Sequence, residues 1–387
     1  MSNTLTGLIG PLYEALDVVS RELVGFTKVV TLDASAESAA VGQEVRSPVV
    51  QPVGLQDITP GLTAPNAGDH IIGNVPVIIT TSKSYPIRWN GEEQKGLNGP
   101  AGAGTTVIMR NQFINAFRAL GNAVDLSLAT AAIAGASRAT GTPGTTPFGV
   151  AGDLSDFALA RKILEDNGAP TTDLNMVINS SSAANLRGKQ SVLFKVNEAG
   201  TDDMLRRGYI GQVEGFKIGQ SAQLKTVVKG TGTGYLVNST GLVIGSVSIP
   251  VDTGTGTILP GDAITFAGDP NVYMVNAYAA GVITIGGPGL QTVIADNTAI
   301  TTGNSYAPNV AFAKSALVLA ARAPAMPVGL DGKPIDSADD MMMITDPVSG
   351  LSFQLTQYRQ YRQIYWEIAL AWGVKAVKPD HIAVLRG

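Results

Sequence analysis

The chain contains no cysteine and only two histidines, His70 and His381, among its 387 residues. The missing cysteine excludes disulfides, thiolate nucleophiles and cysteine-ligated zinc sites. Two histidines are too few for a histidine-rich metal centre, and neither has a serine partner in a recognisable local motif. The sequence therefore predicts no catalytic residue, no metal site and no cofactor.

Charged residues are also scarce. They make up 15% of the chain, against roughly 25% in typical soluble proteins. The 27 basic and 31 acidic residues leave a net charge of −4, so no positive excess exists to attract nucleic acid. A hydrophobic fraction of 44% excludes a disordered chain. Much apolar surface with few charges suits a large assembly, in which subunits bury surface against one another.

Long hydrophobic runs are missing as well. No stretch of about 18 uninterrupted apolar residues occurs, so no membrane span is predicted. Near the N-terminus, Glu14 and Asp17 interrupt the apolar run that a signal peptide needs. We therefore expect a protein made in the cytoplasm and not exported by a signal-peptide route.

Known nucleotide-binding and hydrolase motifs are not present. The segment GLDGK at 329–333 has the wrong spacing for a P-loop, and GPAGAG at 99–104 does not follow a convincing strand. No G-x-S-x-G motif exists. The acidic cluster Asp331, Asp336, Asp339 and Asp340 lacks the alternating order of a calcium loop, which favours a solvated loop. An α/β enzyme is thus disfavoured.

The first hundred residues change once from a helical pattern to an extended one. Apolar residues at helical spacing predict a helix over 11–26. From there to residue 100, segments 45–53 and 74–89 are rich in Val, Ile and Thr and are broken by Pro and Gly. Two extended segments with a long connection predict a projecting β-arm.

One long helix is the clearest element of the sequence. Its apolar stripe runs from residue 106 to about 135 at spacings of three and four: Met109, Phe113, Phe117, Leu120, Val124, Leu128 and Ala131. At 1.5 Å per residue this helix would be on the order of 40 Å long. Gly121 lies in its middle and costs about 1 kcal/mol relative to alanine.

The second half of the chain contains a region of mixed helix and strand signals that is interrupted by a region of short strands. Helix signals begin at Asp153 and at 180–182, with Asn167 and Gly168 as a stop, a short strand over 174–179 and a hairpin over 209–221. Residues 222–305 hold Gly-Thr runs and short alternating strands, which predict a small antiparallel barrel or sandwich inserted into an α/β domain. Long strands follow over 343–387. The aromatic residues of this last segment favour packing against the long helix over a stacking platform for nucleic-acid bases. They are Tyr358, Tyr361, Tyr365, Trp366 and Trp372.

This order of parts resembles that of tailed-phage major capsid proteins. Three stretches carry the likeness: QIYWEIALAWGVKAVKPDHI at 363–382, PGDAITFAG at 260–268 and GYIGQVEGFKIGQS at 208–221. They are most similar to the phage P22 coat protein-like group. The resemblance implies an α+β, HK97-like capsid fold with an inserted antiparallel β-barrel domain.

The resemblance also implies a division of the chain. It gives an N-terminal arm and helix over 1–44, an extended β-arm (the E-loop) over 45–95, and a P-domain with the long helix over 96–150. The A-domain then starts over 151–221, the β-domain is inserted over 222–305, and residues 306–387 return to the A- and P-domains.

By the same resemblance the chain is a coat protein and not an enzyme. Copies would form hexamers and pentamers of an icosahedral head around double-stranded DNA, bound without sequence specificity. A scaffolding protein and a portal protein are the implied partners, a decoration protein is a further candidate, and no membrane is involved. The location would be the virion, after assembly in the host cytoplasm. A surface-layer or adhesin-like structural protein is the alternative.

Two sets of residues are candidates for assembly. Lys83, Arg88, Glu92 and Glu93 either pair across a subunit contact or lie in a solvated loop, and the sequence leaves both open. Some relatives of the wider fold crosslink an arm lysine, but the P22-like group does not, so no crosslink at Lys83 is predicted. Gly96, Gly99 and Gly121 are the candidate hinges for a shell that expands.

Overall fold

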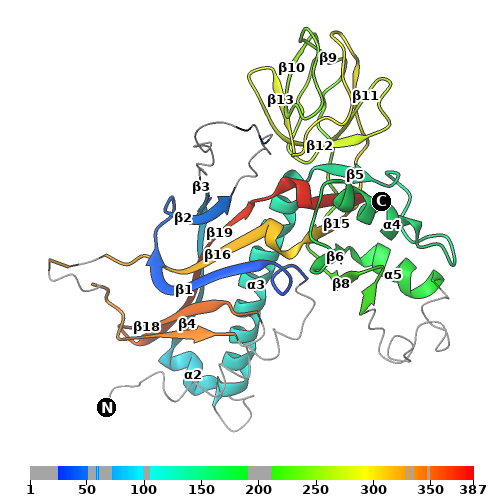
Figure 1. Cartoon of the computed structure of the whole chain (residues 1–387). Coiled ribbons are helices and arrows are strands. Elements are labelled where there is room, and N and C mark those ends of the chain that lie inside the picture. Colours follow the sequence, from blue (N-terminus) through cyan, green and yellow to red (C-terminus); the bar gives the residue numbers. More distant parts are fainter. Residues whose placement is uncertain are drawn as a thin grey trace.

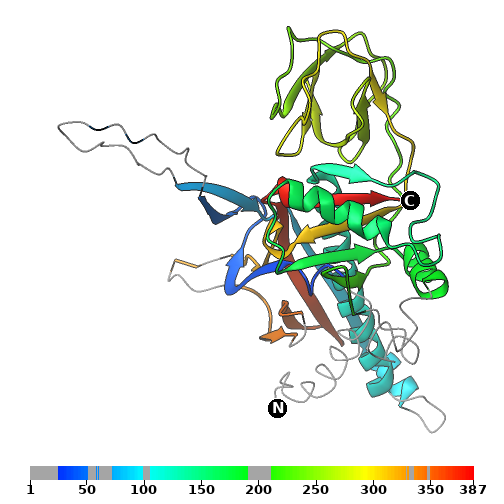
Figure 2. The same ribbon diagram turned by 45° about the vertical axis from the view of Figure 1, so that its right-hand side comes forward.

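The chain folds into three lobes grouped around one long helix (Figures 1 and 2). The computed structural model describes residues 25–50, 58, 60, 72–98, 105–190, 211–327, 329–330, 335–346 and 349–387. The predicted helix over 11–26 lies almost wholly outside these residues, and Gly25 and Phe26 at its end form a turn.

The long helix and a six-stranded sheet form the first part, called here the spine lobe. Helix α3 (Thr105–Ala134) confirms the predicted helix, and the middle of its apolar stripe, from Phe113 to Leu128, is buried. It packs on a sheet of order β1-β16-β19-β18-β17, with β4 on the other edge of β19. The strands are β1 (Thr31–Ala39), β4 (Thr81–Asn90), β16 (Leu317–Pro324), β17 (Asp340–Thr345), β18 (Ser352–Gln360) and β19 (Gln363–Ala376).

The predicted arm over 45–95 divides in the structure. Strands β2 (Glu44–Val50) and β3 (Ile72–Ile78) form a separate two-stranded ribbon that projects from the body (Figure 2). By contrast, β4 pairs with β19 over ten residues, and helix α2 (Gly91–Leu97) follows it directly. The long unbroken pairing with β19 draws residues 81–90 into the spine lobe. The ribbon is therefore shorter than the predicted arm.

A mixed lobe of helices and strands lies on the other side of α3. Its strands run in the order β7-β8-β6-β15-β20-β5: β7 (Gln212–Val213), β8 (Phe216–Gln220), β6 (Leu174–Ile178), β15 (Pro308–Ala313), β20 (Ile382–Arg386) and β5 (Arg138–Thr140). Helices α4 (Ser155–Asp166) and α5 (Ser180–Lys189) pack with this sheet, and short 3-10 helices η3 (Lys314–Ala316) and η4 (Pro379–His381) precede β16 and β20.

The ends of the two helices refine the prediction. Asn167 and Gly168 end α4 as predicted, and Gly168 has a φ of +74°. At its start, Asp153 lies one residue before the cap position and accepts the N–H of Ser155 (2.8 Å). Helix α5 is capped not by a serine but by Asn179, whose side chain accepts the N–H of Ser182. An Asn side chain places its oxygen toward that N–H as well as a serine does.

Residues 230–305 form the third part, called the β-lobe, which leaves the mixed lobe after β8 and returns to it at β15. Its strands are β9 (Leu236–Val237), β10 (Ser248–Asp252), β11 (Ala263–Phe266), β12 (Val272–Ala279), β13 (Val282–Ile285) and β14 (Ile300–Thr302). Antiparallel pairings run β9-β10-β13-β12-β11-β14, and a bridge from Leu236 to Ala299, next to β14, closes the ring. The β-lobe has its own apolar core and contains four aspartates but no lysine or arginine.

Candidate assembly surfaces

The β2–β3 ribbon exposes two backbone edges. Its seven residue pairs run from Glu44 with Ile78 to Val50 with Ile72, and no third strand of the described residues joins this sheet. Pro48 and Pro76 occupy positions of equal parity in this register. Proline has no N–H to give to the partner strand, so these two residues must lie at positions whose backbone groups point away from that strand. Because this direction alternates along an antiparallel pair, the other even-numbered residues of β2 and β3 also direct their backbone groups outward. The outer edges of the ribbon therefore present backbone groups that can pair with another strand.

The base of the ribbon is held firmly. Val77 and Ile79 are fully buried in a small cluster with Ala39, Val318, Ala320 and Ala371. The backbone of Ile79 exchanges hydrogen bonds with residues 42 and 43, and Thr80 donates its N–H to the carbonyl of Trp372 (3.2 Å). This anchoring fixes the direction in which the ribbon leaves the spine lobe.

The predicted contact residues Lys83 and Arg88 lie on β4, an edge strand that pairs only with β19 within the described part of the chain. Both are exposed. They are five residues apart, so they point to opposite faces of the sheet. Lys83 shares a face with Ile87 and Trp89, and Trp89 donates its indole N–H to the side chain of Gln112 on α3 (2.8 Å). The structure therefore does not bring Lys83 and Arg88 together.

Glu92 and Glu93 lie in the first turn of α2. The Glu93 carboxylate accepts the backbone N–H of Asn90 (3.1 Å), while Glu93 donates its own N–H to the Asn90 side chain (2.7 Å). This reciprocal pair is a capping box, which stabilises the start of the helix. Glu93 thus has a structural role inside its own subunit, and Glu92 is left to face outward.

Glu92 lines a groove at the end of the spine lobe, between α2 and the turn that joins β18 to β19. The groove has a volume of about 660 Å³. Tyr361 in that turn is 88% exposed, and the Arg362 guanidinium lies 5.7 Å from the centre of its ring. An exposed aromatic ring beside a cation is typical of residues that dominate protein interfaces. The sequence grouped Tyr361 with the packing aromatics, which is right for the buried Trp366 and Trp372 but wrong for Tyr361.

Four exposed aliphatic side chains lie at and beside one turn of the β-lobe, and they are called the Val243 patch here. Val243 (66% exposed) and Val293 (66%) stand opposite each other, because the bridge from Leu242 to Ile294 sets their register. Ile244 and Val247 extend the patch along a tight turn and are also exposed. Turn positions are usually polar, and contiguous exposed apolar side chains mark interaction sites.

The candidate hinge residues have different surroundings. Gly121 lies inside the unbroken helix α3, and Gly96 lies in α2; a Cβ added to either would meet no atom within 4 Å. Gly99 lies outside the described residues. Whether the two helical glycines bend in a larger assembly stays a prediction.

One buried carboxylate on α3 binds two segments that are far from it in the sequence. Asp125, the only acidic residue of α3, is 1% exposed and accepts the N–H of Phe26 (2.9 Å) and the hydroxyl of Ser221. Burial raises its pKa above the ordinary value. It thereby links the N-terminal turn and the end of β8 to the long helix. The sequence analysis missed it, although a single carboxylate in an apolar helix was the available signal.

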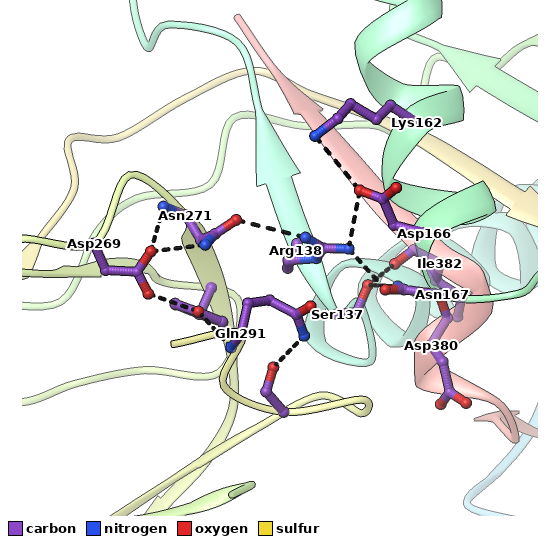
Figure 3. A network of polar contacts seen from close by, with 12 residues as sticks. Ser137, Arg138, Lys162, Asp166, Asn167, Asp269, Asn271, Gln291, Asp380 and Ile382 are labelled. Atoms are coloured by element: carbon purple, nitrogen blue, oxygen red, sulfur yellow. Dashed lines mark hydrogen bonds and ion pairs between the residues drawn. The ribbon is translucent and has the colours of Figure 1, made fainter. Parts of the chain in front are cut away.

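A polar network fixes the β-lobe to the mixed lobe (Figure 3). Arg138, on β5, donates to the side chains of Asn167 at the end of α4 (2.8 Å) and of Asn271 in the β-lobe (3.5 Å). Asn167 in turn donates to Ser137 and to the carbonyl of Asp380 (2.7 Å). Arg138 is only 6% exposed, so these hydrogen bonds form away from water, where they hold orientation well.

The described part of the chain contains neither a cluster of metal-binding side chains nor a helix that could span a membrane. No three His, Cys, Asp or Glu side chains gather there as a metal ion requires. Burial lowers the pKa of His381, and His70 lies outside the described residues. No helix among the described residues is long and apolar enough to cross a membrane.

Neither a family model nor a curated protein matches the chain. Solved structures do resemble it. One of Mycobacterium phage Che8 is 15% identical, with 89% of this chain and 84% of that chain covered and a TM-score of 0.45. The capsid of the cyanophage P-SCSP1u is 13% identical, with 93% of this chain and 87% of that chain covered and a TM-score of 0.48. A virus-like particle from Pyrococcus furiosus is 8% identical, with 98% of this chain and 99% of that chain covered and a TM-score of 0.43.

Proposed function

We propose that this chain is the major capsid protein of a tailed phage, a structural protein whose copies assemble into a closed shell, and not an enzyme. The observation that carries the proposal is the β2–β3 ribbon. Within the described residues its two strands pair only with each other, and the ribbon projects from the spine lobe and is anchored at its base by a buried cluster. The base of the ribbon, at Val77, belongs to the core of its own subunit, and the part beyond it can lie across a neighbour by strand addition.

The other surfaces support the same proposal. The Tyr361 groove and the Val243 patch lie on different lobes, so one copy offers several neighbours a contact at once. Each contact is small, but many contacts per subunit multiply into a stable shell. The low charge of the chain keeps the repulsion between copies weak.

In the proposed shell, the parts take the places that the resemblance implies. The spine lobe with α3 is the P-domain of an HK97-like fold, the ribbon is the E-loop, the mixed lobe is the A-domain and the β-lobe is the inserted barrel of the P22-like group. Hexamers and pentamers of the chain build an icosahedral head around double-stranded DNA. A scaffolding protein and a portal protein take part in a rounder precursor that expands on maturation, and a decoration protein is a further candidate partner.

The first test is negative-stain electron microscopy with light scattering on the full chain, expressed alone and together with a scaffolding protein of the same phage. We expect closed shells or tubes tens of nanometres across. Flat arrays would favour the surface-layer alternative. A chain that stays a small oligomer in both preparations would refute the capsid proposal.

The role of the ribbon can be tested by removing one outward N–H. Asn74→Pro on β3 and Arg46→Pro on β2 each delete an N–H at an outward, even-numbered position and leave the bonds between β2 and β3 intact. Asn74→Ala and Arg46→Ala keep the N–H and are the matched controls. At least one proline variant should form fewer shells than its control. Equal shell yields for all four would exclude strand addition along the ribbon.

A further inference from the structure

The guanidinium of Arg386, at the end of β20, has no counter-ion among the residues that the structure describes. The side chain is 8% exposed, and its Nη2 donates to the carbonyl of Gly141 (2.9 Å). Its Nε has no hydrogen-bond partner, and no carboxylate of the described residues lies within ion-pair distance. Burial lowers the pKa of Arg386, since the charged form loses water without gaining an opposite charge. A buried charge in this state calls for a partner.

The other buried arginines of the chain do have partners. Arg322 lies 2.9 Å from a carboxylate oxygen of Asp33, and Arg138 belongs to the network of Figure 3 with Asn167 and Asp166. Both of these buried guanidinium groups have a carboxylate within ion-pair distance, although the Nε of Arg138, like that of Arg386, has no hydrogen-bond partner. Of the three buried arginines among the described residues, Arg386 is the one without a carboxylate within ion-pair distance.

Arg386 lines a surface pocket of about 760 Å³ in the mixed lobe, near the end marked C in Figure 1. The pocket lies between the loop over 141–150, the first turn of α4 and helix α5, where Lys189 supplies a second cation. Its rim is apolar: Val150 is 66% exposed and Leu159 is 46% exposed. The site therefore combines an unpaired cation with an uncovered aliphatic rim.

Two carboxylates also line the pocket, and their bonds restrict what can bind. Asp156 accepts the N–H of Phe148 (2.7 Å), and Asp153 accepts the N–H of Ser155 (2.8 Å). A small free anion would meet Arg386 but also these two negative charges, and it would leave Val150 and Leu159 exposed to water. A polypeptide segment can place one carboxylate on Arg386, cover the rim with apolar side chains and offer backbone N–H groups to the aspartates.

We propose that this pocket receives an aspartate or glutamate side chain, flanked by apolar residues, from a second copy of the chain. The inference rests on the proposed self-assembly and names one of its contacts. Since the donor segment and the pocket are different surfaces of the same chain, the contact is heterologous, and such contacts repeat around a closed ring of subunits.

Lys189 allows a direct test in the natural chain. Shells assembled from equal amounts of 14N- and 15N-labelled protein are treated with a carbodiimide, which joins amines to carboxylates in contact, and the linked peptides are identified by mass spectrometry. We expect Lys189 linked to an acidic residue of the other isotope in shells, and not in unassembled subunits. Shells in which Lys189 is linked only within its own copy, or not at all, would overturn the inference while leaving the capsid proposal intact.

A pair of variants separates docking from a purely structural role. Arg386→Met removes an uncompensated charge, so the melting temperature of unassembled protein should not fall, while the concentration needed for assembly should rise about tenfold. Arg386→Lys keeps the charge and should restore part of the assembly. The matched control Arg138→Met breaks a bonded network and should lower the melting temperature.

Two results would contradict the proposal. One is an Arg386→Met variant that assembles as well as the natural chain. The other is a melting temperature that inorganic phosphate raises in the natural chain but not in Arg386→Met, because the pocket would then bind a free oxyanion in place of a neighbouring subunit.

Discussion

Replacing Gly121 by alanine tests both the stability of α3 and its proposed bending. Glycine inside a helix is less favourable than alanine by about 1 kcal/mol, because its backbone loses more freedom on folding. A Cβ at residue 121 would meet no atom within 4 Å, so no clash opposes this gain. Gly121→Ala should therefore stabilise the helix by about 1 kcal/mol.

Two other glycines give the comparison. Gly96 also has open space for a Cβ but lies near the end of the short helix α2, where the gain should be smaller. A Cβ on Gly373 in β19 would lie 2.0 Å from the carbonyl oxygen of Ile78, so the ribbon base would have to move. Gly373→Ala should destabilise the fold by about 1–3 kcal/mol, the usual cost of overpacking.

Amide hydrogen exchange along α3 is the suitable assay, since it reads local opening in a protein too large for a simple two-state analysis. A gain of about 1 kcal/mol corresponds to about fivefold slower exchange of the amides around residue 121. Unchanged or faster exchange would refute this account of Gly121. In assembled material, precursor and expanded shells of unchanged shape would count against a hinge at this residue.

Four further predictions concern single sites. Burial raises the pKa of Asp125 above 3.8, so the folded state binds that proton more tightly than the unfolded state. The contribution of Asp125 to stability should therefore fall as the pH rises from about 4 through the raised pKa. Asp125→Asn should abolish this pH dependence of the denaturation midpoint. The pKa of His381 is lowered by burial, so its contribution is complete above about 6.5 and should be lost as the pH falls below that value, a loss that His381→Gln should prevent in the same titration. Leu128→Ala removes a fully buried side chain of α3 and should cost about 2–5 kcal/mol, whereas the more exposed Leu126→Ala should cost less than about 1 kcal/mol in chemical denaturation. The double change Val243→Ser and Val293→Ser should leave the melting temperature of free subunits nearly unchanged and reduce shell yield, and an equal yield would show that the patch stays uncovered in the shell.

Local patterns predicted the elements whose signals lie close together in the chain. The apolar stripe of α3, from Met109 to Ala131, fixes one face over about six turns and leaves no competing structure. The hairpin of β7 and β8 follows from Glu214 and Gly215, which both adopt positive φ (48° and 83°), as a tight hairpin turn requires. Such features depend on neighbours in sequence and are therefore readable from it.

The features missed depend on partners far away in the chain. Residues 74–89 read as one extended run, but only the register with β19, nearly 300 residues later, assigns 81–90 to the spine lobe. Asp125 joins distant segments because it accepts hydrogen bonds from Phe26 and Ser221, which approach it only after folding. Arg386 is informative because no acid of the described residues pairs with it, and the absence of a contact cannot be seen in a sequence.

The β-lobe changes how the free subunit behaves in solution before any shell exists. Its four aspartates account for the whole net charge of −4, and outside residues 230–305 acidic and basic residues are equal in number. Proteins near zero net charge tend to associate and precipitate. Without the β-lobe, the remaining chain would be electrically neutral and rich in apolar surface. If copies assemble as proposed, the β-lobe supplies the net charge that opposes precipitation of the free subunits.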